Sequence, residues 1–253
     1  MAVSAGAAGP VTFSCHEEDL QWAGASCSED EPCSIYLELS AVASAGRRVF
    51  VSGNLHTSAA TLNSLLLASD DNGLTWTEPV SRMRGNAIEA IAFHDAQYGW
   101  AAGETQYPLA RDPFFLITSD GGHSWHQKAV LEEGSAGAVI RFDFDSPQYG
   151  QLVIDAGNSG GKSRYWSYES HTSGESWNLT GKSERAPAAS KYSAEANWRI
   201  RTSADGQQWL VEQRSGERWN PFASFPVEAA VCRGETSEPA APPETEDAAG
   251  ARR

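Results

Sequence analysis

Residues 156–163, Ala-Gly-Asn-Ser-Gly-Gly-Lys-Ser, satisfy the relaxed form of the phosphate-binding loop, with Ala in the first position. Such a loop binds phosphate because a strand leads into it and a helix leaves it, so that backbone N–H groups and the helix dipole meet the anion. Residues 152–154 can form the strand, but residues 164–169 alternate like another strand. We therefore interpret the segment as a connection between strands and predict no nucleotide or other cofactor.

Histidine and cysteine offer little metal-binding chemistry. His123 and His126 flank Trp125 in a tight hairpin, where positions i and i+3 do not converge as they do on a helix. No Cys-x-x-Cys pair occurs, and structural zinc prefers close ligand pairs. We predict no metal site, and we assign Asp71 and Asp120 a structural role rather than calcium binding.

The elements that would position any site are marked by a recurring turn, Ser/Thr-x-Asp-x-Gly-x-x-Trp. Glycine supplies a positive φ, and the Asp and Ser/Thr side chains bond backbone N–H groups and so hold a tight hairpin. The Trp packs its apolar face on the next unit while its indole N–H seeks an acceptor. We interpret these residues as a structural staple. The copies are Ser69, Asp71, Gly73 and Trp76; Thr118, Asp120, Gly122 and Trp125; and Ser170, Gly174 and Trp177, where Thr172 replaces the Asp.

A fourth copy of the turn is ambiguous. Either Gly206 with Trp209 or Gly216 with Trp219 fits the Gly-x-x-Trp frame. We prefer Gly216 with Trp219.

Short runs of β-branched and aromatic residues precede each turn, separated by Gly, Asn or Asp. In the second unit they cover residues 86–93, 98–103 and 114–117, and the turn glycines recur after 49 and then 52 residues. Each unit therefore reads as a four-stranded antiparallel meander of the size of one propeller blade. The sequence predicts an all-β β-propeller of about four blades, with five as the alternative. It leaves open whether the blades close a ring or form an open arc.

The turn resembles the Asp-box, or bacterial neuraminidase repeat, and its combination with Phe-x-Asp and Gly-Trp-Ala-x-Gly is similar to the photosystem II stability and assembly factor family. The resemblance covers roughly residues 35 to 226 and implies a propeller with a role in assembling or stabilising a larger complex. Family propellers usually have about six or more blades, whereas this stretch holds four. The match rests on Phe93, Asp95, Gly99, Trp100, Gly103, Thr118, Asp120, Gly122 and Trp125.

Asp-box proteins also include sialidases, so the resemblance makes sialidase chemistry the main alternative. That family needs an Arg cluster, a Tyr nucleophile with a Glu partner, and an Asp acid/base near the propeller axis. Residues 198–201, Trp-Arg-Ile-Arg, lack the Pro that its signature places after Arg-Ile, and Asp-boxes lie at the periphery of those enzymes. We expect no catalytic residue and no enzyme, with a glycoside hydrolase or a carbohydrate-binding module as the alternatives. The available arginines are Arg47, Arg48, Arg141, Arg199 and Arg201; exposed aromatics such as Trp166 or Trp198 would serve a carbohydrate site.

Four cysteines lie at the two ends of the chain. Cys27 and Cys33 suggest a local bridge, and Cys15 with Cys232 suggests a clasp between the termini, although four cysteines allow three pairings. Disulfides and the family resemblance favour an exported protein, periplasmic or extracellular. No signal peptide is visible in the first nine residues, and no apolar run approaches the ~20 residues of a membrane span.

The formal net charge is −14, and much of it lies outside the repeats. Residues 1–34 form an acidic, cysteine-containing segment, residues 35–232 hold the repeats, and residues 233–253 read as a disordered acidic Pro/Ala-rich tail. A nucleic-acid partner is not expected, because it requires a basic stripe.

The longest irregular loops fall between the second and third strands of their units. Insertions at one repeat position lie on one face, which is often the binding face. We therefore expect a non-catalytic module that binds a protein partner or complex through this face. Its candidate residues are Gln106, Tyr107, Arg111, Arg164, Tyr165 and Trp166.

Overall fold

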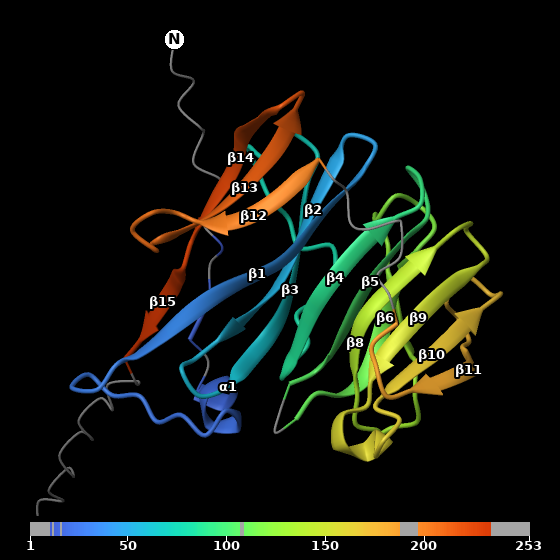
Figure 1. Ribbon diagram of the computed structural model, residues 1–253. Coiled ribbons are helices and arrows are strands. Elements are labelled where there is room, and N and C mark those ends of the chain that lie inside the picture. Colours follow the sequence, from blue (N-terminus) through green and yellow to red (C-terminus); the bar gives the residue numbers. More distant parts are fainter. Residues whose placement is uncertain (1–10, 12, 16, 107–108, 188–196, 234–253) are drawn as a thin grey trace, which may run out of the picture.

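The computed structural model describes residues 11, 13–15, 17–106, 109–187 and 197–233. Apart from the short helix α1 (Glu17–Trp22) and the single-turn helix η1 (Gly157–Gly160), the regular structure consists of antiparallel strands in four sheets (Figure 1). The fold is all-β and of the β-propeller class, as the repeats predict. The expected disordered tail lies outside the described residues from residue 234 onward.

The second and third sheets are meanders in chain order, each made by one repeat unit. The second contains β4 (Asn86–Phe93), β5 (Gly99–Thr105), β6 (Arg111–Thr118) and β7 (His126–Ala129). The third contains β8 (Ala138–Phe144), β9 (Gly150–Asp155), β10 (Tyr165–Ser170) and β11 (Asn178–Ser183).

The first and fourth sheets depart from this plan. The first has the order β15-β1-β2-β3, so its outer member comes from the C-terminal end of the repeats; the fourth has only the three strands β12-β13-β14. The expectation of a four-stranded blade therefore fails for the fourth unit. The bounds are β1 (Cys33–Ala45), β2 (Arg48–His56), β3 (Thr61–Ser69), β12 (Trp198–Thr202), β13 (Gln208–Ser215), β14 (Arg218–Pro226) and β15 (Glu228–Cys232).

Three hydrophobic clusters join the four sheets in a row. One cluster includes Leu37 and Val51 of the first sheet with Phe225 of the fourth, a second joins the first and second sheets, and a third joins the second and third sheets through residues such as Trp100 and Ile154. No cluster of the described residues joins the third sheet to the fourth, and these two sheets lie on opposite sides of Figure 1. The sheets therefore form an open arc.

A β-bulge interrupts the first strand of three units at the same place. The register shifts across Ser40 in β1, Glu89 in β4 and Ile140 in β8. The residues opposite the shifts are Ser52 and Gly53, Ala102 and Gly103, and Val153 and Ile154 of the following strands. In the second sheet the bulge brings the backbone so close that a Cβ on Gly103 would overlap the carbonyl oxygen of Ala87. The close approach explains why glycine stands at this point of β5.

Replacing Gly103 by Ala is expected to lower the free energy of unfolding by about 2 kcal/mol, because backbone must move to admit the methyl group. Gly181→Ala is the matched control, since Gly181 also lies in a strand but has open space around its Cβ position. Urea denaturation of both variants measures the difference. Equal losses of unfolding free energy in the two variants would show that the backbone near Gly103 moves to admit the methyl group without an energetic cost.

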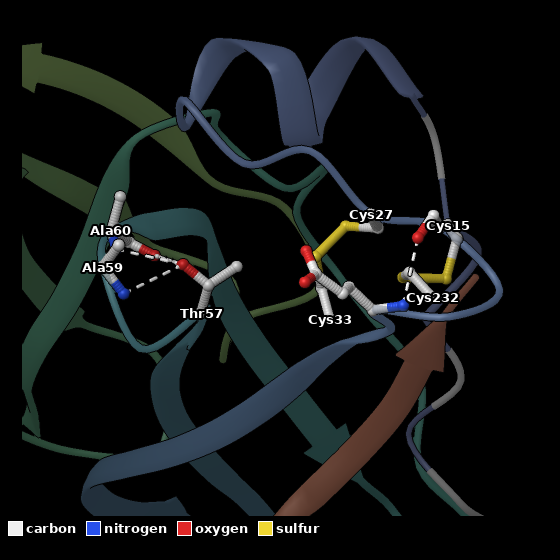
Figure 2. Close-up of a disulfide and its surroundings, with 9 residues drawn as sticks. Cys15, Cys27, Cys33, Thr57, Ala59, Ala60 and Cys232 are labelled. Carbon is white, nitrogen blue, oxygen red and sulfur yellow. Dashed lines mark hydrogen bonds between the residues drawn. A yellow bond between two sulfur atoms is a disulfide. The ribbon is translucent and has the colours of Figure 1, made fainter. Parts of the chain in front are cut away.

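The N-terminal segment packs against the repeats. Leu20 of α1 belongs to the cluster between the first and fourth sheets, and Asp19 accepts a hydrogen bond of 2.7 Å from Nε of Arg84. Both disulfides expected from the sequence are present, Cys15–Cys232 and Cys27–Cys33. Cys33 and Cys232 are paired across β1 and β15, so the two bridges lie side by side at one end of the first sheet (Figure 2).

Candidate binding site at the loop end of the arc

The repeated turns lie where the third strand of a unit ends. In the second sheet, Oγ1 of Thr118 donates to Asp120 at 2.8 Å and accepts from the Gly122 N–H at 2.9 Å, while Asp120 also accepts from the N–H and Oγ of Ser124. The turn at Ser69 and Asp71 makes the same bonds. These bonds lower the pKa of Asp71 to about 2, chiefly through Thr75, and the pKa of Asp120 still further, chiefly through Ser124.

The glycine of each turn contacts an aromatic ring of the neighbouring sheet. A Cβ would meet Phe222 at Gly73, overlap Phe50 at Gly122 and crowd Trp100 at Gly174. The turns are therefore structural contacts between neighbouring sheets, as their residue types predict.

The third and fourth copies deviate. In the third, Gly174 keeps its bond to Ser170 Oγ, but the indole N–H of Trp177 is buried without a hydrogen-bond partner. In the fourth unit the serine–aspartate bond joins Ser203 to Asp205 at 2.5 Å, beside Gly206, and Trp209 donates to the Leu37 carbonyl of the first sheet.

Gly216, the glycine preferred from the sequence, instead lies in the turn between β13 and β14. Its partner Trp219 packs against the Arg199 guanidinium at 4.5 Å. The structure thus places the fourth serine–aspartate bond beside Gly206 and not beside Gly216. The preference for Gly216 rested on the frame Gly-x-x-Trp alone, which does not include the Ser and Asp that make the bond.

Trp125 of the second copy and Trp177 of the third are both half-buried, but they should respond differently to mutation. Trp125 donates from Nε1 to the Gly122 carbonyl at 3.1 Å, whereas Trp177 makes no such bond. Both substitutions to Phe shrink a half-buried ring, but only Trp125→Phe also removes a hydrogen bond. We expect Trp125→Phe to lower the free energy of unfolding by about 1 kcal/mol more than Trp177→Phe. Chemical denaturation of the two variants compares them; a larger loss for Trp177→Phe would contradict the assignment.

The opposite end of each sheet carries the loops between second and third strands, at residues 57–60, 106–110 and 156–164. We call this the loop end. Of the residues expected there, Arg164 binds Asp155 at 2.6 Å and lies 5.6 Å from the Tyr165 ring, and Arg111 lies 3.5 Å from the Asp112 carboxylate. Tyr107 lies outside the described residues.

The remaining aromatic of the predicted face, Trp166, is half-buried and donates from Nε1 to the Ser163 carbonyl at 2.9 Å. It packs against the cluster between the second and third sheets, and Nζ of Lys182 lies 4.1 Å from its ring centre. The phosphate-loop-like segment contains η1 and leads into β10, so a strand follows it, as interpreted from the sequence. Trp166 is thus part of the packing, and the predicted face does not act as one cluster.

A different group converges at the loop end. Gln106 Nε2 donates to Glu89 at 3.3 Å and to Glu104 at 3.0 Å, and Nδ2 of Asn54 donates to Glu38 at 3.3 Å. Glu38 also lies close enough to Glu89 to raise its pKa. We call Glu38, Glu89 and Glu104, with Asn54 and Gln106, the acidic cluster. It draws one carboxylate from each of β1, β4 and β5.

Burial dominates the electrostatics of the acidic cluster. Glu104 is only 3% exposed, and desolvation followed by repulsion from Glu89 raises its pKa to about 7. Gln106 and the backbone N–H of Val139 partly oppose that rise. Desolvation and repulsion from Glu38 also raise the pKa of Glu89. A site with this arrangement favours any cation that can reach it.

The arginines that a sialidase-like site would use are spread over three sheets. Arg199 and Arg201 both bind Glu212 on the fourth sheet, at 2.6 and 2.9 Å, and Arg48 lies 3.5 Å from Asp70 on the first. Arg141 of the third sheet donates to the Pro187 carbonyl, and Arg47 is exposed between β1 and β2.

Sequence reasoning missed the acidic cluster. The available signal was a polar residue at the equivalent position of the second strand in three units, directly after the residue that lies opposite the bulge: Asn54, Glu104 and Asp155. Asp155 of the third unit binds Arg164, whereas Asn54 and Glu104 belong to the acidic cluster.

No protein-family model matches the chain, and no curated protein sequence matches it. Among solved structures, it is similar to YCF48 bound to D1 peptide, with 16% identity and a TM-score of 0.41 over 75% of this chain and 56% of that chain. It is also similar to YCF48 from Cyanidioschyzon merolae (15%, TM-score 0.36, 75% and 56%) and to the GH74 xyloglucanase from Xanthomonas campestris (12%, TM-score 0.40, 72% and 28%). The chain thus spans little more than half of the YCF48 chains and about a quarter of the xyloglucanase.

Proposed function

We propose that this chain is an Asp-box propeller that binds a protein partner without catalysis, in an assembly or stabilising role like that of the photosystem II assembly factors. The observation that carries the proposal is the contrast between the turn end and the loop end of the sheets. At the turn end, the side chains of the repeated turns form hydrogen bonds within the turns, and the turn glycines pack on neighbouring sheets. The loop end instead carries three carboxylates, Glu38, Glu89 and Glu104, that form no ion pair with a basic side chain among the described residues.

The disulfides support an exported setting. Bridges of this kind persist in oxidising compartments such as the periplasm or the extracellular space. In the described part of the chain, no helix combines the length and apolar character needed to cross a membrane. The partner is therefore expected in the cell envelope or outside the cell.

Glycoside hydrolysis is the alternative, and the Glu89–Glu104 pair is the observation in its favour, because paired carboxylates with separated pKa values serve as acid and base. Against it, Glu89 and Glu104 both accept from the same Gln106 Nε2, and the arginines that would hold a sugar carboxylate are spread over three sheets.

The test compares two bulky substitutions at exposed alanines on opposite ends of the arc. Ala59 lies in the loop at residues 57–60, whose backbone is held by Thr57, and Ala96 lies between β4 and β5 at the turn end (Figure 2 shows the Ala59 loop). Tagged wild-type protein, Ala59→Trp and Ala96→Trp are used to capture partners from the organism's own cell envelope, and hydrolysis of sialyl and aryl glycosides is assayed on the same samples.

We expect one stoichiometric partner with the wild-type protein and with Ala96→Trp, a loss of it with Ala59→Trp, and no turnover. Equal capture by both variants would refute binding at the loop end. Turnover that disappears in Glu104→Gln, with no partner captured, would replace the proposal with the hydrolase.

A further inference from the structure

We infer that the acidic cluster is the binding site for one cationic side chain of the partner, and that it prefers an arginine to a lysine. This inference rests on the proposed function and names the chemistry by which the loop end would recognise its partner. Arg supplies five N–H donors in a planar fork, and Lys supplies three from a single nitrogen.

The first observation is a missing cation. Elsewhere the protein pairs its most buried carboxylates with arginine: Asp19 with Arg84, and Glu212 with Arg199 and Arg201. Within the described residues, no Lys, Arg or His forms an ion pair with Glu38, Glu89 or Glu104. Buried charges in proteins are normally paired, so the buried Glu104, with Glu89 and Glu38 as its acidic neighbours, calls for a cation from elsewhere.

The second observation is that two buried acceptors of the cluster have no donor. Oδ1 of Asn54 and Oε2 of Glu104 are buried without a hydrogen-bond partner, in side chains only 4% and 3% exposed. Unsatisfied buried polar atoms are rare and call for an explanation. Both atoms are acceptors. Oδ1 of Asn54 lacks an N–H or O–H donor, and Oε2 of Glu104 has none in hydrogen-bond geometry, although the Val139 N–H lies near enough to lower the pKa of the carboxyl group.

The geometry favours an organic cation over a metal ion. Among the described residues, no group of three or more His, Cys, Asp or Glu side chains lies close enough to hold a metal. Carboxylates spread over β1, β4 and β5 instead suit a group several ångströms wide, such as a guanidinium. Glu38 is exposed, so the cluster opens to solvent at its first-sheet side.

Binding should release a proton from Glu104. The groups that face it are Glu89 of β4 and Gln106 beyond β5, with Glu38 of β1 beside Glu89, while the nearest cation of β8, Arg141, lies 3.8 Å from Asp143. With its pKa at about 7, Glu104 is mostly protonated at pH 6 and mostly ionised at pH 8. A bound cation requires the ionised form, so the affinity should be about tenfold higher at pH 8 than at pH 6.

The experiment titrates the full chain with three blocked tripeptides, acetyl-Ala-X-Ala-amide with X as Arg, Lys or Gln, and follows backbone amide signals by NMR. We expect saturable shifts at Gly103 and Glu104 with the Arg peptide, weaker binding of the Lys peptide, and none of the Gln peptide. Glu104→Gln should weaken Arg-peptide binding at least tenfold and abolish its pH dependence. Glu184→Gln, an exposed residue after β11, is the control with the same change of charge.

Three results would overturn the inference: no saturation by about 10 mM Arg peptide, equal binding of the Gln peptide, or undiminished binding by Glu104→Gln. In each case a partner captured by the wild-type protein and lost in Ala59→Trp would leave the proposed function intact. Absence of any partner, with the Arg peptide bound as expected, would remove the function and retain the cation site.

Discussion

Replacing Glu104 by Gln is expected to raise the free energy of unfolding at pH 8 by up to about 3 kcal/mol and to change it little at pH 5. The substitution keeps the shape of the side chain and the oxygen that accepts from Gln106. It removes a charge that burial and Glu89 both disfavour. The gain is an upper value, because water entering the cluster would lessen the repulsion.

The sign follows from proton binding. In the folded protein the pKa of Glu104 is raised from 4.5 to about 7, so between these values the folded state binds more protons than the unfolded state. The stability of the wild-type protein should therefore fall as the pH rises through this window, and Glu104→Gln should abolish that part of the fall. Urea denaturation at pH 5, 6, 7 and 8 measures both curves.

Glu212→Gln provides the contrast at a second buried carboxylate. The pKa of Glu212 is lowered, chiefly by Arg201, because it accepts from Arg201 and Arg199. Its removal leaves two guanidinium groups without their partner, so this variant should be less stable than the wild type at pH 8. A loss of stability in Glu104→Gln at pH 8 would show that the Glu104 charge is already compensated, which would also weaken the cation site.

The parts of the fold that the sequence predicts well are those set by local chemistry. The turns at Ser69 and Thr118 need glycine for a positive φ and an Asp to bind backbone N–H groups, so their residues identify them directly. The strand runs before them follow from apolar periodicity. The positions of the cysteines suggest the pairing but leave three pairings open, and the structure has the suggested one, Cys15–Cys232 and Cys27–Cys33.

The parts that the sequence does not predict depend on contacts between distant segments. Residues 228–232 join the first sheet as β15, in a register that sets Cys232 opposite Cys33, and no repeat pattern encodes this pairing. The open arc is not encoded by any motif; it follows from the finding that, among the described residues, no hydrophobic cluster joins the third sheet to the fourth. The acidic cluster is not predicted for the same reason. Glu38, Glu89 and Glu104 come from three strands, and each alone resembles an ordinary carboxylate of a strand.

The two disulfides should differ greatly in their effect on stability. Cys15–Cys232 closes a chain separation of 217 residues and Cys27–Cys33 one of 6. In the chain-entropy account, a bridge stabilises by limiting the unfolded chain, and the effect grows with the length of the loop. We expect Cys15→Ala/Cys232→Ala to lose about 5 kcal/mol and Cys27→Ala/Cys33→Ala about 2 kcal/mol, measured by urea denaturation without reductant.

The long bridge should also determine where the arc opens first. Cys232 ends β15, which pairs with β1 of the first sheet and follows β14 of the fourth, so the bridge ties both sheets to the N-terminal segment. Without it, hydrogen exchange should quicken in β15 and α1 well before β9, whose contacts lie within the third sheet and its cluster with the second. Uniformly faster exchange along the whole chain would instead mean that the bridge acts only through the unfolded state. Since no cluster of the described residues joins the third sheet to the fourth, the fourth sheet is held on the arc by its hydrophobic cluster with the first sheet and by the bridge at Cys232, six residues after β14.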